Sequence, residues 1–389
     1  MRIAFIVNEV TPRGGIGRVV LNLAKNLKEQ GHKIQILTIN YNSNFTGLYG
    51  IEEKEIICYK KLMILNELRK IPIFGFLLQI IKFQILGLLL SRQLIKSKPD
   101  IINSHHYLCG ISGWIVSRMI KRPHICSLHG IHLSKLIMNS IYYWVDYVIL
   151  KFLKNHVSHF ISVDPVIKSH NPFKTISDKI EIIFPCIDGK YLELLEGDKP
   201  KTKNKGGFHL IYMGRLEKQK GLGELFRRLK EDVLCWSELK VVGSGNYEDQ
   251  LKELASKLNI SDKIVFKGFL DGQAKVQVMK DSDIFISYSR SEGFPLTILE
   301  FFSLGKPCII YPVGGISYFQ NRIENEKLGI FLKPKPNFLR EILTSPDIST
   351  LFLESVCEAR RNFVRDFYPK LITQRYIKFF KKIAVTEIS

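Results

Sequence analysis

Paired cysteines are missing from this sequence. Its seven cysteines are scattered, with no Cys-x-x-Cys pair, which excludes a disulfide-stapled secreted domain and the common zinc-binding modules. Several lie within apolar runs and are expected to be reduced thiols of the core. The histidines form no His-Glu-x-x-His pattern either, so we expect no metal requirement.

Acidic residues are scarce relative to basic ones. The 389 residues include 57 Lys and Arg against 37 Asp and Glu, a formal net charge of +20. Such an excess predicts an anionic partner, namely a nucleic acid, a phosphorylated substrate or a lipid headgroup. A nucleic-acid binder is the least favoured of the three, because neither a recognition helix nor a base-stacking aromatic motif is visible.

The sequence also shows no signal-peptide layout, since residues 1–7 pass directly into a strand pattern, and a cytoplasmic protein is expected. Its one long apolar stretch, 71–90, contains Gln79, Lys82 and Gln84, which make spanning a bilayer costly. Two interpretations stay open. The stretch is either a helix covering a parallel sheet, or an interfacial helix drawn by its basic flanks to anionic lipid on the cytoplasmic face of the inner membrane.

Apolar strand-like runs alternate with helical patterns along most of the chain. The basic, glycine-containing segment 197–207 interrupts this alternation, which restarts at residue 208. The pattern predicts an α/β fold with two Rossmann-like, doubly wound domains, residues 1–196 and 207–369, facing a central cleft. Ligands of such sheets gather at the carboxyl ends of the strands.

The stretch that organises the prediction is 290–300, Arg-Ser-Glu-Gly-Phe-Pro-Leu-Thr-Ile-Leu-Glu. It follows a buried strand pattern and turns into a helix near Pro295, an arrangement that favours anion binding by free backbone N–H groups. Glu292 and Glu300 flank this turn, and carboxylates accept hydrogen bonds from hydroxyl groups. A ligand with phosphate, ribose and sugar hydroxyls therefore fits, although a solvated helix face is the alternative.

A basic loop follows the first strand of the second half. Arg215 comes after Gly214 at the strand end, and Lys220 precedes the next helix. Arginine binds phosphate through two N–H groups and lysine as a point charge, so both can converge on a diphosphate. Lys218 is the better example of a merely solvated charge.

Two features of the first half are expected to face the same predicted cleft. Gly14-Gly15-Ile16-Gly17 forms the first strand-to-helix turn, where glycine lets the backbone approach a phosphate or a sugar, although a plain tight turn fits too. His129 ends a strand and can donate a hydrogen bond to a sugar hydroxyl. Three other histidines occupy rival positions: His105, His106 and His132.

Asp281-Ser282-Asp283 has the D-x-D pattern that holds a metal in many sugar-nucleotide enzymes. It falls at a helix end that enters a buried strand, which is the wrong end of that strand for the cleft. We therefore interpret it as a cap and turn.

In combination, these motifs resemble a retaining GT-B glycosyltransferase of the large family four type, and the likeness covers nearly the whole chain. Glu292 and Glu300 match the E-x7-E motif of that family. The other matches, in family order, are the Gly14-Gly15 turn, His129, Gly214-Arg215 with Lys220-Gly221 as G-R-x4-K-G, and the loop Val313-Gly314-Gly315.

The resemblance implies donor binding mostly in the second domain and acceptor binding mostly in the first, with a C-terminal helix, about 370–389, packing back on the first domain. It also implies a role for each matched position. Gly214, Arg215 and Lys220 would bind the diphosphate, Gly15 would approach the phosphates and Glu300 would bind the ribose. Glu292, His129 and the backbone of Phe294, Pro295 and Leu296 would contact the donor sugar.

The activity implied is transfer of a hexose or N-acetylhexosamine from a UDP- or GDP-sugar, without a metal, to a saccharide acceptor. A lipid-linked acceptor in cell-surface polysaccharide biosynthesis is favoured by the basic, apolar segment 60–98. No carboxylate pair is evident for double displacement. The resemblance instead implies front-face attack, with Arg215 and Lys220 assisting the leaving diphosphate. The departures Phe301-Phe302 and Tyr318 leave the donor sugar open.

A sugar-nucleotide epimerase of the same architecture is the alternative enzyme. It would need general acid and base carboxylates in the cleft.

Overall fold

The computed structural model describes residues 1–12, 14–63, 74–130, 141–195, 207–231, 233–333 and 338–388. The chain forms two compact units, Met1–Asp188 with Pro369–Ser389, and Gly189–Tyr368. The division precedes the expected boundary, because α7 (Gly189–Leu195) packs against α10 and α11 of the second unit. The segment 197–206 lies outside the described residues, and the cleft between domains stays a prediction.

The first unit is built on a seven-stranded sheet in which every neighbouring pair is parallel. Its chain order reverses beside β1, the pattern of a doubly wound sheet. In sheet order the strands are β5 (Ile56–Cys58), β3 (Lys33–Thr38), β1 (Arg2–Ile6), β6 (Ile101–His105), β7 (His124–Leu128), β8 (His159–Ser162) and β9 (Ile180–Ile182).

The apolar run at residues 2–10 does not form a single strand. It breaks after Ile6, and β2 (Glu9–Val10) pairs with β4 (Asn40–Tyr41) in a separate two-stranded sheet. The polar segment 40–50 contains β4 and α2 (Ser43–Gly47), whose first turn is capped by the Asn42 side chain. Short elements of this kind carry too few residues to show a periodicity.

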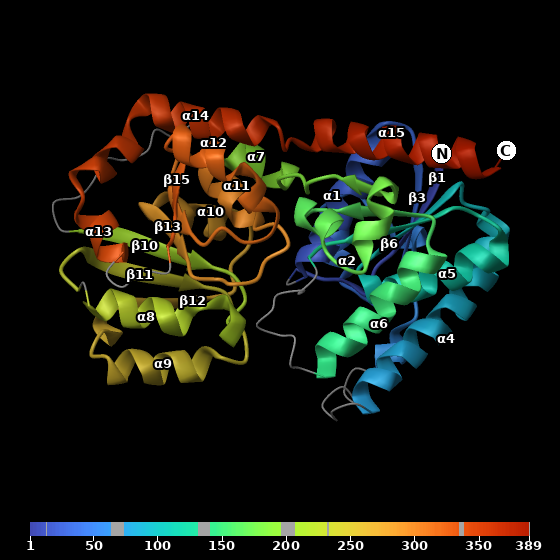
Figure 1. Cartoon of the computed structure of the whole chain (residues 1–389), viewed down its shortest axis with the longest axis horizontal. Coiled ribbons are helices and arrows are strands. Elements are labelled where there is room, and N and C mark those ends of the chain that lie inside the picture. The colour runs from blue at the N-terminus through green and yellow to red at the C-terminus, as the bar shows by residue number, and fades with distance from the viewer. Residues whose placement is uncertain are drawn as a thin grey trace. The chain divides into compact units, whose positions relative to one another are not determined.

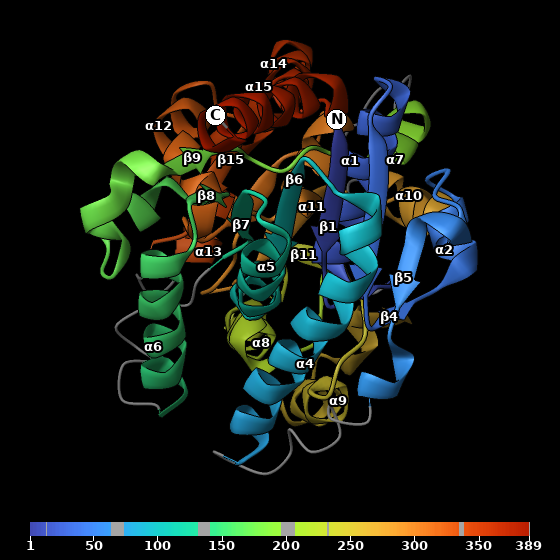
Figure 2. The same cartoon turned by 90° about the vertical axis from the view of Figure 1, so that its right-hand side faces the viewer.

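Helices cover both faces of the first sheet, and β1 shows why. Ile3 and Phe5 point into one apolar cluster with α1 (Gly15–Glu29) and α15 (Pro369–Ile388), whereas Ala4 and Ile6 point into the other. That second cluster contains α4 (Phe74–Ser97), α5 (Tyr107–Ile120) and α6 (Ile141–His156), which Figure 2 shows together on the near side. Successive residues of a strand face opposite sides of the sheet, so a doubly covered strand is apolar throughout.

The apolar stretch 71–90 forms most of α4, while 71–73 lies outside the described residues. Leu86, Leu90 and Leu94 of α4 are fully buried against the sheet, so the helix is a covering helix on this face. In the described part of the chain, no helix is both long enough and apolar enough to cross a membrane.

The second unit repeats the doubly wound plan with six parallel strands, and its order reverses between β10 and β13. In sheet order these are β12 (Ile264–Gly268), β11 (Trp236–Val242), β10 (Phe208–Met213), β13 (Ile284–Ser287), β14 (Cys308–Ile310) and β15 (Gly329–Phe331). Figure 1 shows α8 and α9 on one side of this sheet and α10 and α11 on the other. The helices are α8 (Leu222–Glu231), α9 (Glu248–Lys257), α10 (Gly272–Lys280), α11 (Leu296–Ser303), α12 (Gln320–Asn325), α13 (Phe338–Thr344) and α14 (Glu354–Arg365).

A buried arginine fixes the far end of α11. The Arg360 guanidinium on α14 donates hydrogen bonds to the carbonyl oxygens of Leu328 at 2.6 Å, Gly305 at 2.8 Å and Leu351 at 2.6 Å. Burial lowers the pKa of Arg360 to about 10. The side chain stays charged at neutral pH and satisfies carbonyls that would otherwise be buried without partners. This anchor holds the helix that carries Glu300.

Candidate functional site

The site in the second unit lies where β10 and β13 end side by side. These neighbouring strands belong to the two halves of the sheet whose connections run in opposite directions, and the crevice at such a reversal is where parallel α/β sheets bind ligands. The loop 214–221 follows β10, and the loop 288–295 follows β13. Both predicted motifs of the second half therefore emerge at the same point of one sheet.

Glycines let these loops pack backbone against backbone. Gly221 has φ +73° and Gly314 has φ +62°, a region that favours glycine. A Cβ at Gly221 would collide with the carbonyl oxygen of Tyr288, and one at Gly314 with the carbonyl oxygens of Glu292 and Gly293. The N–H of Gly315 also donates to the carbonyl of Gly293 at 2.7 Å, so the loops after β10, β13 and β14 form one assembly.

Lys220 and Glu292 form the ion pair at the centre of this assembly. Lys220 Nζ lies 2.7 Å from Glu292 Oε1, and the two side chains are only 9% and 22% exposed. A lysine that lies next to a loop-end carboxylate is held in place without a ligand. The sequence predicted a phosphate contact for Lys220 and a sugar contact for Glu292, and the structure joins the two residues directly.

Arg215 lies at the open side of the same loop. Its side chain is 61% exposed, and its Nη1 lies 2.6 Å from Glu217 Oε1. The carbonyl of Arg215 accepts a hydrogen bond from the Tyr212 hydroxyl at 3.0 Å, and burial raises the pKa of that hydroxyl. The backbone at Arg215 is thus anchored, while its guanidinium can rotate toward a ligand.

Glu300 is the most buried carboxylate of the predicted set, at 5% exposure. Its Oε1 accepts a hydrogen bond from Lys275 Nζ of α10 at 2.6 Å. Its Oε2 is buried and has no hydrogen-bond partner within the described residues. A buried charged oxygen without a partner is costly, so this atom is a ready acceptor for a ligand hydroxyl.

Lys275 is held by more than Glu300. Its ammonium lies 4.5 Å from the ring centroid of Tyr191 on α7, and the Tyr191 hydroxyl donates a short hydrogen bond to Asp271, the N-cap of α10. A cation over an aromatic face is attracted by the ring quadrupole. These contacts fix the lysine that orients Glu300.

The turn 293–296 ends in α11 as the sequence predicted. The helix begins at Leu296 with Pro295 as N-cap, and no side chain caps it. Proline lacks an N–H and has a fixed φ, so it suits a position at the start of a helix. The Phe294 ring lies 5.5 Å from that of Phe367, which leaves the role of this turn to its backbone.

The first unit contributes His129 at the end of β7. Its Nε2 lies 2.8 Å from Nδ1 of His105 at the end of β6. Burial lowers the pKa of His129 to about 4 and lowers that of His105 well below its ordinary value, so both rings are neutral at pH 7. One ring must donate to the other, and this hydrogen bond couples their tautomers.

The structure separates the rival histidines. His105 lies behind His129, and the His106 side chain accepts a hydrogen bond from Leu108 N at the start of α5. His132 lies outside the described residues. His129 therefore remains the candidate for the sugar contact, because His105 is fully buried behind it.

Gly15 starts α1, and no described atom lies within 4 Å of the position that a Cβ would take. Gly17 differs, because a Cβ there would lie 2.8 Å from the carbonyl of Glu9. Gly17 is needed for packing within the chain, whereas the space beside Gly15 is open.

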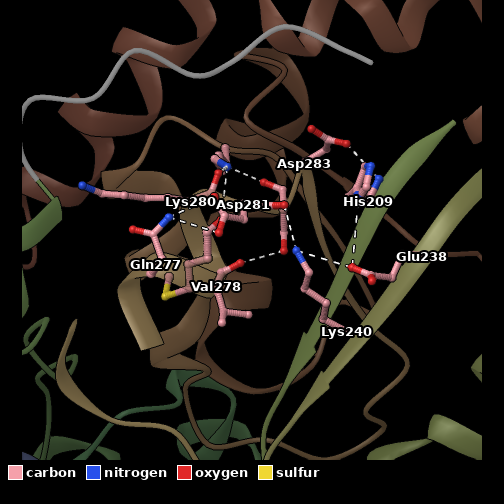
Figure 3. Close-up of polar contacts among 11 residues, drawn as sticks. His209, Glu238, Lys240, Gln277, Val278, Lys280, Asp281 and Asp283 are labelled. Carbon is pink, nitrogen blue, oxygen red and sulfur yellow. Dashed lines mark hydrogen bonds and ion pairs between the residues drawn. The ribbon is translucent and has the colours of Figure 1, made fainter. Parts of the chain in front are cut away.

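Asp281 and Asp283 lie at the amino ends of the strands (Figure 3). Asp281 is the C-cap of α10, and its carbonyl accepts a hydrogen bond from Lys240 Nζ at 2.9 Å. Asp283 Oδ2 accepts one from the backbone N–H of His209 at 2.8 Å. The predicted cap and turn is confirmed. Across the described ranges, no three His, Cys, Asp or Glu side chains are grouped closely enough to hold a metal.

Two residues of the site escaped the sequence reading. Lys275 and Tyr191 are 25 and 109 residues away from Glu300 in the chain, and nothing local marks them. Only the contact of α7 with α10 and α11 brings them to Glu300.

Comparison with known proteins identifies both halves of the chain. Residues 196–339 match the family model "Glycosyl transferases group 1", and residues 13–190 match "Glycosyltransferase Family 4". An uncharacterised glycosyltransferase of Methanocaldococcus jannaschii is 25% identical over 359 residues, 86% of each chain. The alpha-monoglucosyldiacylglycerol synthase of Streptococcus pneumoniae is 23% identical over 379 residues, 90% of this chain and 80% of its own.

Among solved structures, Anabaena HepE in complex with UDP-glucose superposes with a TM-score of 0.74 at 18% identity, covering 98% of this chain and 100% of its own. This likeness concerns the fold.

Proposed function

Because the chain belongs to the glycosyl transferases of group 1 and family 4, with the GT-B fold of two Rossmann-like domains, we propose that its donor is a nucleotide-diphosphate hexose or N-acetylhexosamine. The observation that carries this proposal is the pair Lys220–Glu292 at the β10/β13 reversal. The pair holds an ammonium beside a carboxylate within one glycine-packed loop assembly. An ammonium suits a diphosphate, and the carboxylate suits the hydroxyls of the attached sugar.

The nucleoside end of the donor fits Glu300. Its Oε2 is a buried acceptor without a hydrogen-bond partner among the described residues, and a ribose hydroxyl would satisfy it. Lys275 keeps the other oxygen occupied, so the carboxylate presents a single atom to the ligand. The complex of HepE with UDP-glucose supports a nucleotide sugar as the donor class.

The reaction we propose retains configuration at the anomeric carbon. An acceptor hydroxyl oxygen forms the new bond on the face from which the diphosphate leaves, the old carbon–oxygen bond breaks, and the hydroxyl proton passes to the departing phosphate oxygen. Lys220 and the exposed guanidinium of Arg215 stabilise the negative charge that develops on the diphosphate, which is a large contribution in a preorganised site. No step uses a metal ion.

His129 is proposed to contact the donor sugar from the first unit. Its neutral ring can donate or accept a hydrogen bond without adding charge. The open space beside Gly15 suits the phosphates in the same way.

The acceptor is proposed to be a saccharide carried by a lipid, as in cell-surface polysaccharide biosynthesis. The name of the pneumococcal relative, alpha-monoglucosyldiacylglycerol synthase, supports a lipid as part of the acceptor. An epimerase is not supported, because both matching family models describe glycosyl transfer.

A panel of UDP- and GDP-sugars tests the proposal. The protein should release free nucleotide from one donor, faster with a matching acceptor. Lys220→Ala should slow the release by roughly 100- to 1,000-fold, while Lys218→Ala, on the same loop, leaves it intact. Conversion of the donor sugar to another sugar nucleotide without an acceptor would contradict transfer.

A further inference from the structure

Helix α4 has a second apolar face, on the side away from the sheet. Ile81, Ile85, Leu88 and Ile95 are 45%, 38%, 52% and 49% exposed. With Arg92, which is also exposed, they follow a spacing of 4, 3, 4 and 3 residues. At about 100° per residue these five side chains lie within an arc of about 80°.

A helix that covers a sheet ordinarily presents polar side chains to water. Among the described residues of the second unit, the exposed large apolar side chains lie singly, as at Leu234 and Leu353. Contiguous exposed apolar surface marks a contact with something outside the chain. Figures 1 and 2 both draw α4 at the outside of its unit, beside α5.

The charge around this row has one sign. Helices α4 and α5 contain no Asp or Glu, and their exposed basic side chains are Arg92, Lys96 and Arg118. Arg92 lies within the row, and Lys96 lies at its edge. The neighbouring α5 ends with exposed Arg118 and Met119, which repeats the combination of a basic and an apolar side chain.

We propose that this face of α4, the row Ile81–Ile95 with Arg92 and Lys96, docks on an anionic membrane surface. Apolar side chains would enter the headgroup boundary while the basic side chains contact lipid phosphates, the arrangement of an interfacial helix. The row is about 21 Å long, and α4 lies flat on the sheet through Leu86, Leu90 and Leu94. The helix therefore contacts lipid along its side. The inference rests on this surface and not on the transfer reaction.

Vesicle flotation at physiological ionic strength tests the proposal. Wild-type protein should float with phosphatidylcholine vesicles that contain phosphatidylglycerol and stay behind with phosphatidylcholine alone. A variant with Ile81→Ser, Ile85→Ser and Leu88→Ser should lose about tenfold or more of the partitioning, and so should one with Arg92→Glu and Lys96→Glu.

Matched controls come from the second unit. Leu234→Ser with Leu353→Ser removes exposed apolar side chains elsewhere, and Lys230→Glu with Lys327→Glu changes the net charge by the same amount as the α4 pair. Both controls should float like wild type. All variants should bind UDP or GDP like wild type, which separates this test from the proposed function.

Three results would overturn the proposal. The first is a wild-type protein that binds neither vesicle. The second is charge controls that lose binding as much as the α4 variants, which would indicate bulk charge. The third is a wild-type dimer that the serine variant converts to a monomer without any change in flotation, which would assign the face to a second copy of this chain.

Discussion

The two units share one topology but differ in charge. The first has 29 Lys and Arg against 13 Asp and Glu, and the second has 28 against 24. The proposed diphosphate site lies in the nearly balanced unit, where each key lysine has its own glutamate. Most of the excess positive charge, from which the sequence predicts an anionic partner, lies in the other unit. Local geometry holds a diphosphate, whereas bulk charge suits an extended anionic surface.

The polar groups at the candidate sites of the two units also differ in charge. The second unit uses ionised pairs, Lys220–Glu292 and Lys275–Glu300. The first uses His105 and His129, whose pKa values are lowered by burial. The charged site is thus expected to provide electrostatic stabilisation, and the neutral one orientation.

The largest effect is expected at Lys220, and it tests the contrast between the charged site and the neutral histidine pair. Lys220→Ala should lower kcat by roughly 100- to 1,000-fold, because it removes the charge that stabilises the leaving diphosphate. His129→Ala should lower it less, because an orienting hydrogen bond contributes less than a charge. Steady-state kinetics with the matched donor measures both, and circular dichroism checks folding. A larger loss at His129 than at Lys220 would reverse the roles of the two units.

Glu300 and Lys275 give the next effect. Glu300→Gln should weaken UDP or GDP binding about tenfold, since a neutral amide accepts a ribose hydroxyl less strongly than a carboxylate. Lys275→Met should weaken it less, because this lysine acts through Glu300. Calorimetry of both variants and the double variant measures the coupling. Fully additive losses would show that Lys275 does not position Glu300.

Two glycines are expected to have different roles, Gly314 in packing and Gly15 in the approach of the ligand. Gly314→Ala should reduce the free energy of unfolding by roughly 1–3 kcal/mol, because φ is positive and the Cβ meets backbone oxygens. Gly15→Ala should leave unfolding unchanged, because no described atom lies near its Cβ, yet raise KM for the donor. Denaturant titration and kinetics test the pair. A destabilised Gly15→Ala would mean that Gly15 serves the fold alone.

Acid should destabilise the first unit. Burial lowers the pKa of His105, that of His124 to about 3 and that of His129 to about 4. Below the unfolded value near 6.5 the unfolded chain binds protons that the folded chain does not, so stability is complete above pH 6.5 and falls toward pH 4. The loss is roughly 1–2 kcal/mol at pH 5 for each of His124 and His129.

Denaturant titrations at pH 7 and pH 5 measure this loss, and His124→Asn should reduce its pH dependence. Equal stability at the two pH values would contradict neutral, buried histidines.

The smallest effect concerns metal. Treatment with EDTA should leave transfer unchanged within experimental error, because Lys220 and Arg215 are proposed to provide the positive charge. A loss of activity that Mg²⁺ or Mn²⁺ restores would contradict this part of the mechanism.

The sequence predicted most of the fold because its strands are apolar, covered on both faces and alternate with helices. A strand such as β4, which has two residues, is too short to show a period in the sequence. The sequence found Lys220 and Glu292 because each lies next to a glycine turn, and Glu300 because of its Glu-x7-Glu spacing from Glu292. It missed the partners of Glu300, because Lys275 and Tyr191 reach that residue only through helix packing.

For a related reason, the sequence left two interpretations open for the stretch 71–90, which forms most of α4. An apolar run with a few polar residues does not tell which side faces the sheet. The structure assigns Leu86, Leu90 and Leu94 to the sheet and leaves Ile81, Ile85 and their neighbours exposed.

A crystal structure with a bound nucleotide sugar tests the central claim most directly. The account predicts the diphosphate within hydrogen-bond distance of Lys220 Nζ and the Arg215 guanidinium, a ribose hydroxyl on Glu300 Oε2, and Glu292 turned from Lys220 toward the sugar. A nucleotide bound elsewhere, with the Lys220–Glu292 pair intact and Glu300 Oε2 still without a partner, would contradict it.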